Sequence, residues 1–332
     1  MERPLLRILT ALMLLCASLA PAAAQDEVRI GIGFGLAFLP LYVCQDLKLI
    51  EKYGKEAHLD VKASFTRLMG AAQMRDALAS GAVDVAPFGT APLLAAWEQG
   101  KDTPQQIFAV AGVTTLPLTL LSNRPDEQSF ADLKASDRIA VPTPTAPQLY
   151  VLELQSEKIF GRYDRLRAQV VALPHPDAVD ALIEGGGAVT AYFASPPFTE
   201  LASRDPRIHA LLRSSDVFGG KSSLLIMAAS KAYIEREPQI PEVIDRAIDE
   251  AARIIHDDPR RAAQIFLTHE PSGTINGAEM TAVLNDVRDD FGSAIHGVQA
   301  IADFMARHGE LKAPPASWKE IVAPALLNSP SS

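Results

Sequence analysis

The feature that most constrains this chain of 332 residues is the regular alternation of apolar, strand-like runs with helical patterns. Alternation at this spacing is typical of βα units that build largely parallel sheets, so we expect an α/β fold. Beyond residue 231 the patterns become almost wholly helical. The expected strands are 28–34, 59–65, 83–89, 106–113, 138–143, 169–173, 188–194 and 223–230. The expected helices between them are 40–54, 71–81, 90–100, 147–161 and 176–186.

Two segments of the chain are similar to each other. Residues 76–92 read DALASGAVDVAPFGTAP and residues 180–197 read DALIEGGGAVTAYFASPP, which places Thr90 opposite Ser195. Each copy predicts a helix, a glycine stop, a strand and a hydroxyl residue that caps the next helix. Two interpretations are open: chance similarity between ordinary βα units, or two lobes of similar build whose corresponding edges face one another.

The first 24 residues have the layout of a secretory signal peptide. Arg3 and Arg7 give a basic start, residues 8–20 are apolar, and an A-x-A pattern ends at Ala24. We therefore expect cleavage near Ala24 and an exported, soluble protein. Cleavage leaves Cys44 alone, so we expect neither a disulfide nor a cysteine metal site. A lone cysteine on the apolar face of a helix is expected to be buried and inert.

Charge and motifs exclude several classes of function. The net charge of −9 and a pI of about 5.3 argue against nucleic acid and anionic membrane surfaces as partners. After the signal peptide no stretch is long enough to be a membrane-spanning helix, so we expect no membrane insertion. The chain lacks a G-x-S-x-G elbow, an H-E-x-x-H motif and a P-loop, so we expect no enzyme, no catalytic residue and no cofactor.

Histidines and acids gather at a few places without the spacing of a metal site. His256 in IIHDDP, and His269 with Glu270 in LTHEP, are interpreted as residues of exposed helix ends. His175 in LPHPDA is expected in a loop or a capping role, with a ligand contact as the alternative. We expect no metal ligand.

The glycine-rich run 28–40, VRIGIGFGLAFLP, raises the question of a nucleotide site. A dinucleotide fingerprint needs G-x-G-x-x-G and an acid about twenty residues later. Here the spacing is G-x-G-x-G, position 36 is leucine, and the second strand leads to Arg67 rather than to a carboxylate. Arg67 could suit a ribose phosphate, but such cofactors are scarce outside the cytoplasm, so export argues against this interpretation.

Ligands of open α/β sheets bind beyond the carboxyl ends of strands, where loops lead into helix N-termini. The loops at these positions read GFGLAFLP, FTRLMGAA, FGTAP, VTTLP, PTPTAP and FASPP, and their only charged residue is Arg67. A buried ammonium group would need a carboxylate partner, so these loops favour a neutral or anionic ligand. Their aromatic residues suggest an apolar or planar portion that rings cover, although individual rings could instead belong to the core.

The same loops carry a resemblance to a known family. Segments such as GFGLAFLPLYVCQDLKLIEKYG, ALASGAVDVAPFGTAPLL, DLKASDRIAVPTPTAPQLYVLELQSEKIFG and HPDAVDALIEGGGAVTAYFASPPF, with the terminal PASWKEIV, occur in the family's order over nearly all of the chain. The chain resembles the exported binding proteins of ABC importers for nitrate, alkanesulfonates and taurine, which are related to thiamine-pyrimidine-precursor binding proteins.

The resemblance implies a two-lobed, type II periplasmic-binding-protein fold of the venus-flytrap kind. Lobe 1 would comprise residues 25–122 with 222–332, lobe 2 residues 123–221, and the strands 116–123 and 222–230 would cross between them. Family contacts to the ligand lie in the matching loops. Carried over position by position, they are Phe34, Gly35, Phe38, Arg67, Gly70, Gly89, Thr90, Thr115, Thr145, Ala146, Tyr192, Phe193 and Ser195.

The resemblance also implies a function. The protein would be a monomeric periplasmic component that captures a small sulfonate-, carboxylate- or pyrimidine-like molecule and delivers it to an ABC permease and its ATPase. Within the loop PTPTAP this chain reads TPTAP where the commoner pattern is glycine-serine-threonine, which disfavours a sulfonate or nitrate. The alternatives are a ligand-sensing subunit of a membrane receptor kinase and, with less support, a pyrimidine-synthase-like enzyme, whose cysteine-rich motif Cys44 alone does not supply.

Overall fold

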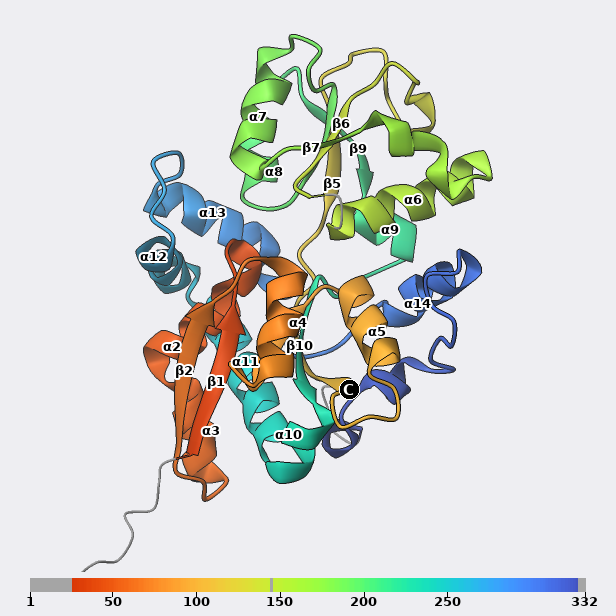
Figure 1. Cartoon of the computed structure of the whole chain (residues 1–332). Coiled ribbons are helices and arrows are strands. Elements are labelled where there is room, and N and C mark those ends of the chain that lie inside the picture. Colours follow the sequence, from red (N-terminus) through yellow and green to blue (C-terminus); the bar gives the residue numbers. More distant parts are fainter. Residues whose placement is uncertain (1–25, 144–145, 328–332) are drawn as a thin grey trace, which may run out of the picture.

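Two lobes, joined by two crossing segments, make up the computed structural model, which describes residues 26–143 and 146–327 (Figure 1). The signal peptide predicted over residues 1–24 lies outside the described residues. Each lobe contains one five-stranded sheet. The strands of lobe 1 are β1 (Asp26–Ile32), β2 (Val61–Arg67), β3 (Val85–Phe88), β4 (Ile107–Thr114) and β10 (Leu225–Ser230). Those of lobe 2 are β5 (Thr119–Ser122), β6 (Ile139–Val141), β7 (Val170–Ala172), β8 (Ala191–Ala194) and β9 (His209–Arg213).

The two sheets have the same construction. Their strand orders are β2-β1-β3-β10-β4 and β7-β6-β8-β5-β9. In lobe 1, β1 pairs in parallel with β2 and β3, and β10 runs antiparallel to β3 and β4. In lobe 2, β6 pairs in parallel with β7 and β8, and β5 runs antiparallel to β8 and β9. The similar segments 76–92 and 180–197 thus contain equivalent strands, β3 and β8, which confirms two lobes of similar build.

Helices cover the sheets and fill the C-terminal part of the chain, as the sequence predicts (Figure 1). Lobe 1 carries α2 (Leu39–Leu47), α3 (Leu49–Glu56), α4 (Gly70–Ser80), α5 (Thr90–Gln99), α10 (Lys231–Arg236), α11 (Ile240–Asp257), α12 (Pro259–His269), α13 (Gly277–Val287) and α14 (Val298–Arg307). Lobe 2 carries α6 (Pro147–Phe160), α7 (His175–Glu184), α8 (Phe198–Ala202) and α9 (Ser214–Phe218). The 3-10 helices are η1 (Leu36–Phe38), η2 (Phe130–Asp132), η3 (Tyr163–Gln169), η4 (Arg288–Asp290), η5 (Trp318–Ile321) and η6 (Pro324–Leu326).

Three sequence-based expectations about the elements were wrong. The helix expected over 40–54 is two helices, because Lys48 adopts left-handed backbone angles (φ 52°) between α2 and α3. Strand β9 was missed, since its five residues sit at a sheet edge and lack a long apolar run. Strand β5 pairs within the second sheet, so the first crossing falls between residues 114 and 119, before the boundary expected at residue 122.

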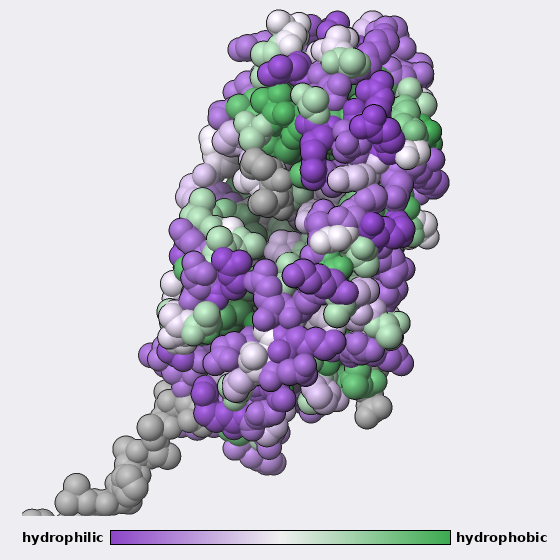
Figure 2. Space-filling model, turned by 45° about the vertical axis from the view of Figure 1, so that its right-hand side comes forward, coloured by the Kyte–Doolittle hydropathy of each residue, from purple (hydrophilic) through white to green (hydrophobic). Residues whose placement is uncertain are grey.

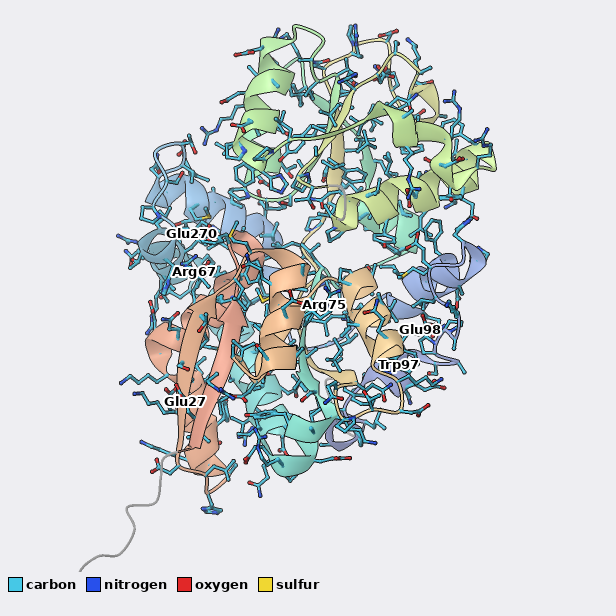
Figure 3. All side chains as sticks on the ribbon, in the orientation of Figure 1. Glu27, Arg67, Arg75, Trp97, Glu98 and Glu270 are labelled. Carbon is cyan, nitrogen blue, oxygen red and sulfur yellow. The ribbon has the colours of Figure 1, made fainter. Side chains whose placement is uncertain are left out.

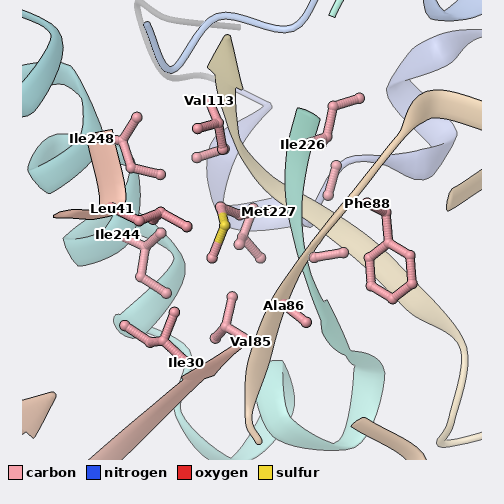
Figure 4. Close-up of a cluster of buried hydrophobic side chains, with 14 of the residues drawn as sticks. Ile30, Leu41, Val85, Ala86, Phe88, Val113, Ile226, Met227, Ile244 and Ile248 are labelled. Carbon is pink, nitrogen blue, oxygen red and sulfur yellow. The ribbon is translucent and has the colours of Figure 1, made fainter. Parts of the chain in front are cut away.

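The core of lobe 1 forms where its sheet meets the long helix α11. Ile30 and Val85 from the sheet lie with Ile244 and Ile248 of α11 in one buried cluster (Figure 4). Cys44 of α2 is fully buried beside α11, with its Sγ 3.5 Å from the Ala247 carbonyl oxygen. Burial raises the pKa of this thiol well above its ordinary value, which disfavours the reactive thiolate. The expectation that Cys44 is buried is confirmed.

Among residues 26–143 and 146–327, no helix combines the length and the apolar character that crossing a membrane requires. The same residues contain no group of three or more histidine, cysteine, aspartate or glutamate side chains placed to hold a metal ion.

Candidate functional site

The candidate site is the region where the two lobes face each other. The surface is hollowed where they meet in the space-filling view (Figure 2). A cavity of about 600 Å³ lies there beside the crossing segments. Lobe 1 contributes Thr115 and Asp286 to its walls, and lobe 2 contributes Pro196, Glu200 and Arg213. A site shared by two lobes can respond to a ligand by closing, because only the closed form contacts the ligand from both sides.

On lobe 1, Arg67 at the end of β2 lies in a stack of planar groups. The Cζ atom of Arg67 is 4.5 Å from the centre of the Phe34 ring and 5.3 Å from the centre of the Tyr42 ring. The Tyr42 ring in turn stacks on His269, with centroids 4.5 Å apart and an interplanar angle of 5°. The guanidinium donates to Tyr42 Oη at 3.3 Å and to the His269 carbonyl at 3.1 Å. These contacts fix the position of the arginine while it stays exposed.

Glu270 is the residue that sequence reasoning missed on this lobe. Its Oε1 accepts a hydrogen bond from the Gly35 backbone N–H at 2.6 Å and another from the Tyr42 hydroxyl. Its neighbour His269 contacts Asp46 at 2.8 Å. Figure 3 shows Glu270 and Arg67 side by side at the top of lobe 1. His269 and Glu270 lie at the end of α12 as expected, but the expectation that this helix end is exposed was wrong, because it packs against the first loop.

The glycines of the first loop now have a structural reason. A Cβ atom on Gly33 would lie 2.4 Å from Cζ of Phe38, so only glycine lets this ring fold over the backbone. Gly35 has φ 101°, a region that side chains rarely adopt, and this conformation presents its N–H to Glu270. The loop is therefore built to hold Phe34 outward, where its side chain is 52% exposed.

The third loop lies close to the second lobe. A Cβ on Gly89 would lie 3.5 Å from Pro147 of lobe 2. The Thr90 hydroxyl is buried and donates to the Ser223 carbonyl at 2.8 Å, so it does not cap α5 as predicted. Ala146, next to Pro147, is also buried.

Thr115 lies on the first crossing segment and in the wall of the interlobe cavity. Its backbone N–H donates to the Asp290 carbonyl at 2.7 Å, and its hydroxyl is 3.3 Å from Asp290 Oδ1. Gly70 begins α4 and is exposed with φ 75°. Thr145 lies outside the described residues.

On lobe 2, the aromatic residues expected to line the site are fully buried. Phe193 packs in the core on one face of the lobe 2 sheet. Tyr192 points to the opposite face, against α7. Neither side chain offers surface to a ligand in this conformation. Ser195, which follows β8, is partly exposed, and its backbone carbonyl, not its hydroxyl, accepts from the first N–H groups of α8.

The capping role preferred for His175 was wrong. This residue begins α7 without a side-chain capping bond. Its Nδ1 is hydrogen-bonded to the Tyr192 hydroxyl, its Nε2 is 3.5 Å from Ser195 Oγ, and its ring stacks on Phe198. Burial lowers the pKa of His175 to about 4, so the ring is neutral at physiological pH.

Carboxylates also reach the cavity from elements that the loop sequences did not include. Glu200 of α8 and Asp286 of α13 both line it. Burial, and then the nearby Asp286 charge, raise the pKa of Glu200 above its usual range. One Glu200 oxygen is buried with no hydrogen-bond partner among the described residues. The loops themselves lack carboxylates, but the cavity between the lobes does not.

Ion pairs tie the lobes together on either side of the cleft. Arg204, just after α8, contacts Glu279 of α13 at 2.8 Å. Beyond the opposite edge, Glu157 of α6 contacts Arg307 at 2.7 Å and His308 at 2.9 Å on and after α14. Because most of these side chains are partly exposed, each pair is weak and can break and re-form as the lobes move.

This architecture, with two similar α/β lobes, two crossings and an interlobe cleft, is the fold of the periplasmic binding proteins. The expected type II fold is thus confirmed at the level of architecture. More narrowly, the chain belongs to the NMT1-like family, whose family model matches residues 22–267. A search of the curated proteins finds no match to the chain.

Solved structures share the fold over nearly the whole chain. The alkanesulfonate-binding protein SsuA from Xanthomonas axonopodis pv. citri, bound to MOPS, is 19% identical, with a TM-score of 0.68 and coverage of 92% of this chain and 99% of that one. The aliphatic sulphonate binding protein SsuA from Escherichia coli is 16% identical, with a TM-score of 0.69 and coverage of 90% and 97%. The nitrate-binding protein NrtA from Synechocystis PCC 6803 is 14% identical, with a TM-score of 0.65 and coverage of 91% and 87%.

Proposed function

We propose that this protein is the periplasmic solute-binding component of an ABC importer. It captures a small organic molecule between its lobes, closes around it, and presents the closed form to a permease and its ATPase. The protein acts by binding and lobe closure, without chemistry on the ligand. The two-lobed fold and membership of the NMT1-like family support this assignment, as do the sulfonate- and nitrate-binding neighbours.

The observation that carries the proposal is the state of Arg67. Of its five N–H donors, one on each terminal nitrogen is engaged by Tyr42 and His269, which leaves three for a ligand. No carboxylate forms an ion pair with Arg67 among the described residues. A cation that is held rigidly between aromatic rings and still has free donors is suited to an anionic group.

Exposed apolar side chains support a ligand with an apolar part. Phe34 and Met69 are 52% and 65% exposed, and both lie in the loops at the cleft end of the lobe 1 sheet. Large exposed apolar groups near a charged group are typical of binding surfaces. We therefore propose a ligand that pairs an acidic or carbonyl group with a planar or aliphatic portion. A carboxylate or a pyrimidine fits the loop PTPTAP better than a simple sulfonate, because TPTAP lacks flexible backbone donors.

The experiment that tests the function is a thermal-shift panel of sulfonates, carboxylates, aromatic acids, pyrimidines and flavins. We expect at least one acid to raise the melting temperature, because a ligand that binds only the folded protein stabilises it. Small-angle scattering should then show a more compact particle with that compound. If no member of the panel raises the melting temperature, the proposed ligand class is contradicted.

Arg67→Ala then tests the site. Loss of charge-assisted hydrogen bonds should weaken the acid found in the panel by about 10- to 100-fold in calorimetry. The matched control is Arg75→Ala on α4 of the same lobe (Figure 3), since the ion pair of Arg75 within the described part of the chain is with its neighbour Asp76, at 3.5 Å. The control should bind like the wild type. Unchanged affinity in Arg67→Ala would remove Arg67 from the site.

A further inference from the structure

A chain of three polar side chains leads from the core of lobe 2 to its cleft edge. The buried Tyr192 hydroxyl is hydrogen-bonded to His175 Nδ1, and His175 Nε2 lies 3.5 Å from Ser195 Oγ. The His175 ring stacks on Phe198, with centroids 4.9 Å apart and an interplanar angle of 10°. The stacking fixes the plane of the imidazole, so its two nitrogens keep one partner each.

The direction of the hydrogen bonds follows from burial. Tyr192 is 0% exposed, and burial raises the pKa of its phenol, so the hydroxyl keeps its proton. That proton needs an acceptor, and the described residues supply none besides His175 Nδ1. The imidazole is neutral, because burial lowers its pKa to about 4, so its single proton must then sit on Nε2. Nε2–H points at Ser195 Oγ.

We propose that His175 is a positioning residue that turns the Ser195 hydroxyl into a hydrogen-bond donor toward an oxygen of the ligand. Nε2–H occupies a lone pair of Ser195 Oγ, so the serine proton points away from the histidine. The proposal rests on the ligand-binding function proposed above and names its chemistry more closely. Tyr192, buried and out of reach of the cleft, acts on a ligand only through His175.

The consequence is a ligand that accepts hydrogen bonds from both lobes. Lobe 1 presents the free N–H groups of Arg67, and lobe 2 presents the Ser195 hydroxyl. A carboxylate, a sulfonate or a carbonyl oxygen satisfies both. Glu200 is the group that would favour the opposite class, since its buried oxygen is an acceptor for an ammonium or amidinium ligand. An acidic ligand would bind through Arg67 and Ser195, and a cationic ligand would bind through Glu200, so the two ligand classes predict opposite preferences in a binding assay.

The first test needs no ligand. Long-range ¹H–¹⁵N spectra of the protein labelled at histidine should show His175 as the neutral Nε2–H tautomer at pH 7 and still neutral at pH 5.5. Tyr192→Phe should abolish the preference, because it removes the donor to Nδ1, and Ser195→Ala should retain it. An Nδ1–H tautomer, or an imidazolium at pH 6, would overturn the inference.

The second test uses three planar probes of similar size: benzoate, benzenesulfonate and benzamidine. We expect calorimetry to detect the acids and not the amidine. His175→Leu should weaken the better acid by about tenfold, while His175→Gln, whose amide N–H stands near the position of Nε2–H, should stay within about threefold of the wild type. A purely structural role of the ring would not be rescued by glutamine. Tighter binding of benzamidine than of both acids would overturn the proposal in favour of Glu200.

The two proposals fail in different ways. If no compound of the wider panel binds while His175 is the Nε2–H tautomer, the binding function is contradicted and the hydrogen-bond direction is established. If a ligand is found but the tautomer is reversed, the function stands and the role of His175 is wrong.

Discussion

The two lobes share a topology, yet they treat equivalent positions differently. In lobe 1, the loops at the sheet end hold Phe34 and Arg67 outward. In lobe 2, the residues at the end of β8 face inward, and Tyr192 and Phe193 are fully buried. Even the matched hydroxyls differ. The Thr90 hydroxyl donates a hydrogen bond to the Ser223 carbonyl, whereas the Ser195 hydroxyl lies next to His175 Nε2. Similar sequence and equal strand order therefore do not assign equal roles in binding.

The largest expected effect separates the buried aromatic from the exposed one. Phe193→Ala should lower the free energy of unfolding by about 3–5 kcal/mol, because it leaves a cavity in the core of lobe 2. Phe34→Ala should change it by less than about 0.5 kcal/mol, because the ring is half exposed. Urea unfolding measures both. Equal losses of stability in the two variants would contradict the difference between a buried Phe193 and an exposed Phe34.

A smaller loss of stability is expected at the glycines that end equivalent helices, and it tests whether the two lobes are built alike. Gly81 and Gly185 end α4 and α7 at equivalent positions with φ 72° and 70°. No atom lies closer than 3.9 Å to a Cβ built at either position. Gly81→Ala and Gly185→Ala should therefore each cost about 1–2 kcal/mol through backbone strain alone.

The control for this pair is Gly186→Ala, which has open space and no positive φ. It should change stability by less than about 0.5 kcal/mol in the same urea titration. A loss confined to one of the two capping glycines would show that the helix ends are not equivalent.

The smallest expected effect concerns the acid that lies between the lobes. The raised pKa of Glu200 means that folding favours its protonated form, so its contribution to stability falls as pH rises through that pKa. Glu200→Gln should therefore raise the melting temperature at pH 7–8, by about 1–3 °C, and match the wild type near pH 4.

Glu157 supplies a control of opposite sign. Its pKa is lowered, first by the hydrogen bond with Arg307, so its contribution is present above its unfolded pKa and is lost as pH falls. Glu157→Gln should lower the melting temperature at neutral pH. The Glu200 account is refuted if both variants shift the melting temperature in the same direction at pH 7.5.

Much of the fold could be predicted from local patterns. The apolar runs and the glycine stops placed eight of the ten strands of the described residues near their observed positions. The similarity of 76–92 to 180–197 indicated the matching sheets. Strand β9 and the break at Lys48 escaped prediction, because a short edge strand and a single left-handed residue have weak local signals.

The candidate site was only partly predictable. The sequence singled out Phe34 and Arg67, because residues after strands gather at one end of an open sheet. It did not reveal Glu270 or Glu200, which arrive from helices α12 and α8. Their approach depends on how the C-terminal helices and the second lobe pack. No spacing along the chain encodes such a contact.

The sequence by itself determined the alternation of strands and helices, the two similar units and the arginine among apolar loops. These follow from side-chain periodicity and backbone preference, which act over a few residues. Only the tertiary structure decided which of those loop residues stay accessible. Tyr192 became core where α7 and α8 cover one face of its strand, and Phe193 where α6 covers the other. His175 and Glu270 gained hydrogen-bond partners from distant elements. Burial and pairing depend on neighbours brought together in space, so they appear only once the chain has folded.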